Sequence, residues 1–204
     1  MMRWGWLSRA AALMLLCGLV TACAVRPPQP TATDNGVAVE AWTSPPVPAA
    51  WRLSGRTSLR LEDEGVTATV VWDQSGSGYR IDLRGAFGAG SLRIVGDDDV
   101  VRLTTADGER YTADSPRELV RAVTGYDLPV SFLRYWVTGR PVPWLDGRVT
   151  PDSAGLPSVI RQSGWRVTYE AFRSVGRYRL PERVAVAREG MSVRIAIGDW
   201  ESRE

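Results

Sequence analysis

From Gly108 to Pro141 the chain reads G-E-R-Y-T-A-D-S-P-R-E-L-V-R-A-V-T-G-Y-D-L-P-V-S-F-L-R-Y-W-V-T-G-R-P, the one convincingly helical region of the sequence. Ser115 is a favoured N-cap residue, and Pro116 suits the first helical position because it has no N–H to satisfy there. Glu118 completes a capping box with Ser115. The pattern therefore predicts a helix that begins at residue 116.

A second short helix is expected directly after the first. Gly125 can take the left-handed conformation that ends the first helix. Ser131 is the expected N-cap of the second, which should end at Gly139 and Pro141. Apolar residues recur at helical spacing in both segments: Leu119, Val120 and Val123 in the first, and Phe132, Leu133, Trp136 and Val137 in the second. Such stripes either cover a face or mouth of a sheet or belong to an ordinary core.

On both sides of the helices, apolar and polar residues alternate with the period of a β-strand. The alternating segments are residues 51–61, 66–72, 79–83, 91–95, 100–104 and 109–113 before the helices, and 158–162, 165–172, 183–188 and 191–197 after them. Residues 140–157, rich in Pro, Asp and Gly, are expected to form a loop. The pattern predicts a mainly β (α+β) fold, an antiparallel barrel or strongly curved sheet of roughly seven to eleven strands.

Composition excludes several classes of function. The 204-residue chain contains no His, which removes Ser–His and Cys–His nucleophiles and the common zinc sites. Every basic residue is Arg. Removal of residues 1–22 would take away Arg3 and Arg9 but no acidic residue, leaving 23 basic and 23 acidic residues. A neutral domain does not favour a nucleic-acid partner. We therefore expect no cofactor, no metal and no nucleic acid.

Residues 1–22 are expected to be a lipoprotein signal peptide. Their apolar run, residues 10–20, has the length of a signal-peptide hydrophobic region and is too short to span a bilayer. The run leads to V-T-A-C at Cys23, which is similar to a lipobox, where the cysteine becomes the lipidated N-terminus. The alternative is an ordinary secretory signal peptide with Cys23 a bystander. Residues 23–50 have the Pro-rich composition of a tether, which leaves residues 51–204 as the folded domain.

Gly85, Ala86, Phe87 and Gly88 form a glycine-rich loop between two predicted strands. No helix follows the loop, so it does not match a phosphate-binding fingerprint. Phe87 either folds back onto the core or stands exposed. An exposed Phe would touch a membrane and contribute roughly 2–3 kcal/mol when buried there.

Taken together, the chain resembles the LolB family of outer-membrane lipoprotein receptors over essentially all of the sequence from Cys23 onward. The motifs that carry the resemblance are G-x-R-Y-T-A-D at residues 108–114, then Leu119, Thr124-Gly125, Pro129, Leu133-Arg134, Trp136 and Gly139, then G-W-x-V-x-Y at residues 164–169 and the closing Asp199-Trp200.

The resemblance implies an open, incomplete antiparallel β-barrel with a short helical lid over an apolar cavity. It implies a monomer, lipid-anchored to the outer membrane through Cys23 and facing the periplasm; Ala24, in place of Asp, implies export to that membrane. Such a receptor accepts the acyl chains of triacylated lipoproteins from a soluble LolA-type carrier and inserts them into the inner leaflet of the outer membrane.

The resemblance also assigns residues to each step. The membrane-insertion loop is Gly85, Ala86, Phe87 and Gly88, with Phe87 in place of the family's usual Leu. The lid and cavity lining are Leu119, Val123, Phe132, Leu133 and Trp136.

Two other functions stay open from the residues alone. A lipid-anchored periplasmic scaffold or activator of a cell-wall enzyme would share the anchor and tether but would need no cavity. An enzyme would need paired carboxylates, for which Asp82 with Asp114, or Glu109 with Asp107, are the candidates; acidic residues at turns and strand faces are usually solvated instead.

Overall fold

The computed structural model describes residues 36–61, 64–86, 90–124 and 129–203. The expected signal peptide, Cys23, Phe87 and Gly88 lie outside the described residues. Residues 35–204 form one compact unit.

Within the described residues, the strands form a single antiparallel sheet in the order β1-β8-β9-β10-β11-β12-β2-β3-β4-β5-β6-β7. The strands are β1 (Val37–Ala38), β2 (Ala50–Leu61), β3 (Glu64–Ser75), β4 (Gly78–Ala86), β5 (Gly90–Gly96), β6 (Val101–Thr105), β7 (Arg110–Ala113), β8 (Gly147–Pro151), β9 (Pro157–Gln162), β10 (Trp165–Val175), β11 (Tyr178–Arg188) and β12 (Met191–Arg203). The order has two free ends, β1 and β7, so the barrel is open and incomplete. The predicted fold class is confirmed.

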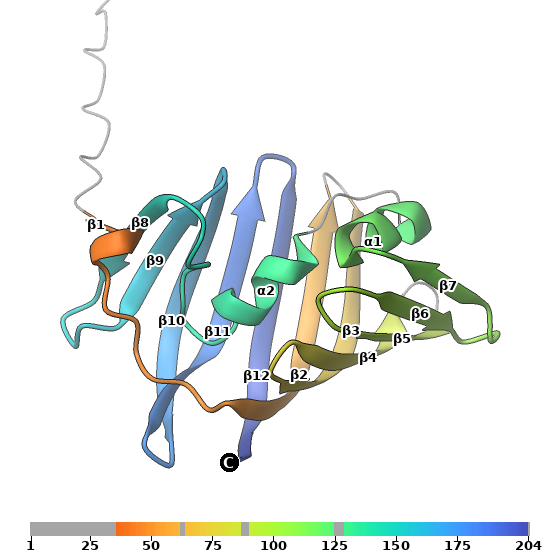
Figure 1. Ribbon diagram of the computed structural model, residues 1–204, viewed down its shortest axis with the longest axis horizontal. Helices are drawn as coiled ribbons and strands as arrows, with labels where there is room; N and C mark the ends of the chain where they lie inside the picture. The colour runs from red at the N-terminus through yellow and green to blue at the C-terminus, as the bar shows by residue number, and fades with distance from the viewer. Residues whose placement is uncertain (1–35, 62–63, 87–89, 125–128, 204) are drawn as a thin grey trace, which may run out of the picture. The chain divides into compact units, whose positions relative to one another are not determined.

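The sheet bends strongly along its length. Figure 1 shows strands that stand upright in β9–β12 and lie nearly horizontal in β5–β7, with α1 and α2 in front of one face. The beginning and end of the domain meet in the middle of the sheet, where β12 pairs with β2 from Met191↔Leu61 to Arg203↔Ala50. The long ladder joins the two halves of the sheet.

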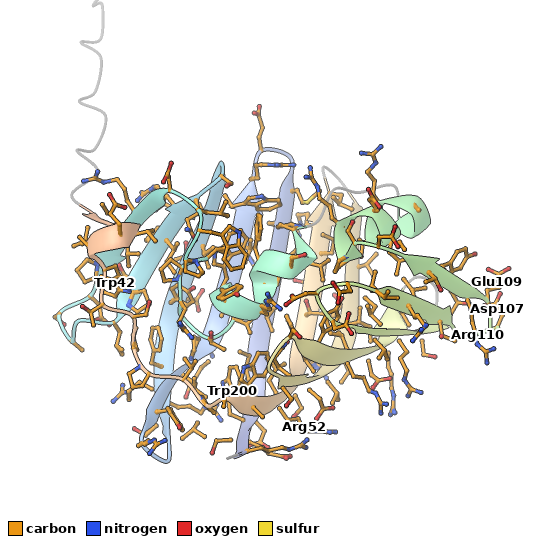
Figure 2. The ribbon with its side chains drawn as sticks, in the orientation of Figure 1. Trp42, Arg52, Asp107, Glu109, Arg110 and Trp200 are labelled. Atoms are coloured by element: carbon orange, nitrogen blue, oxygen red, sulfur yellow. The ribbon has the colours of Figure 1, made fainter. Side chains whose placement is uncertain are left out.

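Strand alternation determines which face is buried. In β2, Trp51 and Leu53 are buried, whereas Arg56 on the opposite face is exposed. Three tryptophans pack together on the inner face: the Trp51 ring lies 5.3 Å from that of Trp72 and 5.4 Å from that of Trp200. Trp200, labelled in Figure 2, also donates its indole N–H to the Pro181 carbonyl at 2.8 Å. This cluster ties β2, β3 and β12 together at one end.

The first helix matches its prediction. It is α1 (Pro116–Thr124), and the Glu118 backbone N–H donates to the Ser115 Oγ at 3.2 Å. The predicted N-cap of the second helix is wrong. The helix α2 (Val130–Trp136) begins two residues earlier than predicted, with Pro129 at the N-cap and no side-chain cap hydrogen bond. The Pro129 carbonyl accepts the Phe132 N–H at 2.9 Å and the Leu133 N–H at 3.3 Å, so the first turn closes without the serine.

Residues 36–50 correct the expected tether, because they pack on the domain. Strand β1 pairs with β8, and the short 3-10 helix η1 (Val39–Ala41) places Val39 in the core. Trp42, labelled in Figure 2, and Val47 also pack against the core. Within the described residues, the packing of the domain therefore extends back to β1, ahead of the predicted start at residue 51. Strand β8, which pairs with both β1 and β9, lies inside the segment 140–157 that was predicted to be a loop, and the described strands outnumber the predicted range.

Candidate functional site

An apolar cavity of about 140 Å³ lies between the inner face of the sheet and the two helices. Its wall comes from one half of the sheet, β12 and β2–β6, and from α1 and α2. The lining residues are Thr57, Leu59, Val66, Ala68, Val70, Trp72, Ile81, Leu83, Leu92, Ile94, Leu103, Val120, Val130, Leu133, Val193 and Ile195.

The chemistry of this wall is that of a hydrocarbon site. Thr57 is the one lining residue with a hydroxyl, and no lining residue carries a charge. The space exists partly because Ala68 and Val70 are small side chains on the inner face of β3, opposite the helices. A wall of this kind binds apolar chains without directional hydrogen bonds, so it tolerates differences in ligand shape.

The C-terminal end of α2 packs over the other half of the sheet, against aromatic and polar side chains of β9 and β10. Trp136 is fully buried, with its ring 5.6 Å from Phe132 and 6.3 Å from Trp165. Its indole N–H donates to the Gln162 side-chain oxygen at 3.1 Å, and its carbonyl accepts the Tyr169 hydroxyl at 2.8 Å. This end of α2 is held in place.

Gln162, buried on β9, is the centre of that anchor. Its side-chain oxygen also accepts the Val142 N–H at 2.8 Å, and its amide nitrogen donates to the carbonyls of Val142 at 2.9 Å and Leu145 at 2.8 Å. Gln162 was not predicted as a site residue. It lies two residues after Ile160 in β9, so strand alternation places both on the buried face, and a buried amide needs partners.

The predicted lid and cavity residues do not all come together. Leu133 lies in the cavity wall. Leu119 and Trp136 are buried in the core and Phe132 is partly buried against it, but none of the three lines this cavity. The side chain of Val123 lies outside the description.

Two helix residues of the cavity wall were missed as lining residues. Val120 was assigned to the apolar stripe, and Val130 is the first residue of α2. Val130 lies three residues before Leu133, so both share one helix face. That spacing was the signal available in the sequence.

The glycine-rich loop joins β4 to β5 at the end of their ladder. The register shifts between Arg84 and Ala86, and Gly85 has a φ of 81°, which favours glycine. Ala86 pairs with Gly90 at the last rung. The backbone of β4 thus places the predicted insertion loop at a sheet end, while Phe87 itself is not described.

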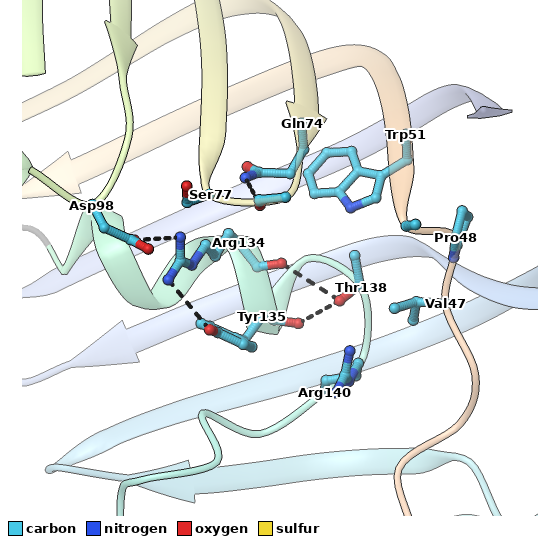
Figure 3. Close-up of a pocket in the computed structure, with 12 residues that line it drawn as sticks. Val47, Pro48, Trp51, Gln74, Ser77, Asp98, Arg134, Tyr135, Thr138 and Arg140 are labelled. Carbon is cyan, nitrogen blue, oxygen red and sulfur yellow. Dashed lines mark hydrogen bonds and ion pairs between the residues drawn. The ribbon is translucent and has the colours of Figure 1, made fainter. Parts of the chain in front are cut away.

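A separate polar cleft of about 380 Å³ lies beside α2, between the turn joining β3 to β4 and the segment before β2 (Figure 3). Arg134 donates to Asp98 at 2.9 Å and to the Tyr135 hydroxyl at 3.3 Å. A narrower pocket of about 60 Å³ adjoins it, with Tyr79 in its wall. Burial raises the pKa of Tyr79 to about 12, although the positive charge of Arg134 opposes that rise.

Among the described residues, no helix is both long enough and apolar enough to cross a membrane.

Residues 49–200 match the family model described as "Outer membrane lipoprotein LolB". The chain is 40% identical to the outer-membrane lipoprotein LolB of Halorhodospira halophila over 74% of each chain. It is 38% identical to that of Alkalilimnicola ehrlichii over 92% of this chain and 96% of the relative.

One solved structure has a similar fold. A putative outer membrane lipoprotein-sorting protein domain from Vibrio parahaemolyticus matches 75% of this chain and 85% of its own, with 12% identity and a TM-score of 0.53. At that identity the likeness concerns the fold alone.

Proposed function

The chain belongs to the LolB family, and we propose that its apolar cavity takes up the acyl chains of other lipoproteins handed over by a LolA-type carrier. As a member of this family the chain is an outer-membrane lipoprotein with a lipoprotein-receptor role. The proposal extends that role to a particular site, a particular partner and a particular anchor, Cys23.

The observation that carries the proposal is the uncharged cavity between the helices and the sheet. Each methylene of an acyl chain costs about 0.8 kcal/mol in water, so a triacylated protein needs an apolar shield to cross the periplasm. A periplasmic scaffold would need no such space. The cavity is what favours a receptor over a scaffold.

The cavity must enlarge to hold cargo. A cavity of about 150 Å³ holds a molecule the size of benzene, and the space here is about 140 Å³. Long acyl chains therefore require α1 and the start of α2 to move away from the sheet. The anchored end of α2 at Gln162 makes the opposite end, near Val130, the part that moves.

Transfer needs no nucleotide in this account. Acyl chains pass from carrier to receptor, and from receptor to membrane, if each successive site binds them more tightly. The test is to mix the full chain with a LolA-type carrier loaded with a lipoprotein and to follow the cargo by pull-down. Movement of cargo to this chain without nucleotide supports the proposal; cargo that stays on the carrier contradicts it.

Delivery to the membrane is assigned to the loop of Gly85, Ala86, Phe87 and Gly88. Phe87→Glu should leave transfer from the carrier unchanged and abolish delivery to liposomes, because a charged side chain cannot enter the apolar layer. Phe87→Leu is the matched control and should retain delivery. Unchanged delivery by Phe87→Glu would rule out the insertion role.

A further inference from the structure

Three spaces in the domain adjoin one another. Trp72 and Val130 line both the apolar cavity and the narrow pocket beside Tyr79. Gln74, Asp98 and Arg134 line both that narrow pocket and the polar cleft of Figure 3. The narrow pocket therefore lies between a hydrocarbon-lined space and a polar one and shares a wall with each.

Donors without acceptors line this series of spaces. The Tyr79 hydroxyl and the Nε atoms of Arg134 and Arg140 are buried without a hydrogen-bond partner in the described part of the chain. Gln74, also in the wall, already has its partners. Gln74 accepts the Trp72 indole N–H at 3.1 Å and donates to the Gly76 carbonyl at 2.9 Å. Buried donors normally find acceptors, so a ligand with several acceptor oxygens would complete them.

The charged side chains of the cleft indicate where the anionic end of such a ligand would bind. Arg134 and Arg140 line the cleft against one carboxylate, that of Asp98, and Asp98 is paired with Arg134. The Arg140 side chain makes no hydrogen bond or ion pair with any described residue, and it reaches the cleft from the segment after α2 (Figure 3). Asp97 and Asp98 lie at the narrow pocket. A negative group is therefore favoured at the Arg140 end, away from the two aspartates.

The rim of the cleft suits a lipid more than a free anion. Trp144 is 59% exposed, and its ring meets that of Tyr135 edge-on at 5.2 Å. Tyr135 itself lines the cleft. Indole and phenol rings combine an apolar body with a polar edge, which is why they collect at the level of lipid headgroups.

We propose that these three spaces, with the helices moved apart as for cargo, bind one anionic phospholipid, with its phosphate at Arg140, its ester oxygens near Tyr79 and Arg134, and one of its acyl chains in the apolar cavity. The inference rests on the cavity of the proposed function but names a second ligand for it. The lipid anchor of a lipoprotein has esters and an amide and no phosphate, so the cleft distinguishes the two. The phospholipid occupies the receptor between deliveries and leaves when the acyl chains of cargo enter.

The test compares two lipids on the full chain, purified in an uncharged detergent. Native mass spectrometry measures the binding of dioctanoyl phosphatidylglycerol, which is anionic, and of dioctanoyl phosphatidylethanolamine, which has no net charge. The proposal expects the anionic lipid to bind at least tenfold more tightly. Arg140→Gln should remove that preference, and Arg140→Lys should restore part of it. Arg56→Gln, on the exposed outer face of β2, is the matched control and should bind like the unaltered chain.

Glycerol phosphate, added as a competitor, separates a lipid site from a site for a free anion. Equal binding of the two lipids, an unchanged preference in Arg140→Gln, or competition by glycerol phosphate at the same concentration as the lipid would each overturn the proposal. Cargo transfer is measured on the same preparations. A retained lipid preference without cargo transfer would contradict the proposed function and support the phospholipid site.

Discussion

Gln162 holds the end of α2 and the segment after it against β9, and its four hydrogen bonds use both lone pairs of its amide oxygen and both of its amide N–H groups. Gln162→Leu keeps the volume but leaves the Trp136 indole N–H and the Val142 N–H buried without acceptors. We expect a loss of about 2–4 kcal/mol in the free energy of unfolding, since each stranded donor costs about 1–3 kcal/mol. Urea unfolding followed by tryptophan fluorescence measures it.

Thr168→Val is the control for that substitution. Thr168 lies on β10, next to β9, on the opposite face of the strand from Tyr169 and the anchor. Substitutions of this kind change stability by about 0.5 kcal/mol or less. A Gln162→Leu protein as stable as Thr168→Val would contradict the anchor.

Buried tyrosines should make the protein sensitive to alkali. Burial raises the pKa of Tyr169 well above its usual range and that of Tyr79 to about 12. The unfolded chain therefore releases these protons first, at a pH of about 10, while the folded state still holds them. Ionisation of the unfolded chain lowers its free energy, so the folded state loses stability above that pH. The free energy of unfolding should therefore be constant from pH 8 to about 10 and fall above it.

The composition makes this prediction easy to check. The chain has no Lys, so few other side chains titrate in that range. Absorbance at 295 nm follows tyrosinate formation, and urea unfolding at each pH gives the stability. Tyr79→Phe should weaken the fall. A stability that rises between pH 10 and 12 would have the wrong sign and would contradict the assignment.

The sequence predicts which residues form the apolar face of each helix, but not which of them line the cavity and which pack in the core. Helical spacing gives Phe132, Leu133 and Trp136 one broad face, and only contact with the sheet divides that face between a cavity and a core. Leu133 meets the cavity, whereas Trp136 is drawn to the donor and acceptor groups of Gln162 and Tyr169. Those partners lie far along the chain, so local pattern cannot reveal them.

At the scale of elements, α1 depends on its cap and α2 does not. Ser115→Ala removes the Oγ that accepts the Glu118 N–H, which should destabilise α1 by about 1 kcal/mol and increase its opening about fivefold. Amide hydrogen exchange across residues 117–122 should speed up by that factor.

Ser131→Ala is the matched control, because α2 has no side-chain cap hydrogen bond. It should leave exchange in both helices unchanged. Equal acceleration by the two substitutions would mean that Ser131 caps α2 after all.

Strands with regular alternation were predicted well, and the two that were missed share one cause. Strands β1 and β8 are short and lie in segments rich in proline, where the local sequence favours loops. Strand β8 forms because it pairs along its whole length with β9, the next strand in the sequence. Strand β1 forms because Val37 pairs with Val149 and the Arg148 side chain donates to the Gly36 carbonyl at 2.7 Å. The partners of β1 lie far along the chain, so its own segment does not reveal them.

At the scale of the molecule, the open sheet and its helices enclose a space that a single side chain can fill. Ala68 lines the cavity from the inner face of β3. Ala68→Phe should place a ring in the cavity and lower the free energy of unfolding by at most about 3 kcal/mol. It should reduce acceptance of lipoprotein cargo at least tenfold, because the ring occupies the space that acyl chains need. Ala196→Phe, on the exposed outer face of β12, is the control. Undiminished cargo acceptance by a folded Ala68→Phe protein would show that cargo binds elsewhere.

The most direct measurement is to locate the acyl chains themselves. A lipoprotein whose acyl chain carries a photoreactive diazirine is passed from a LolA-type carrier to the full chain, irradiated, and mapped by mass spectrometry. The account predicts labels on the cavity wall, at residues such as Leu59, Leu133 and Val193. Labels confined to the outer face of the sheet, or found only on the carrier, would contradict it.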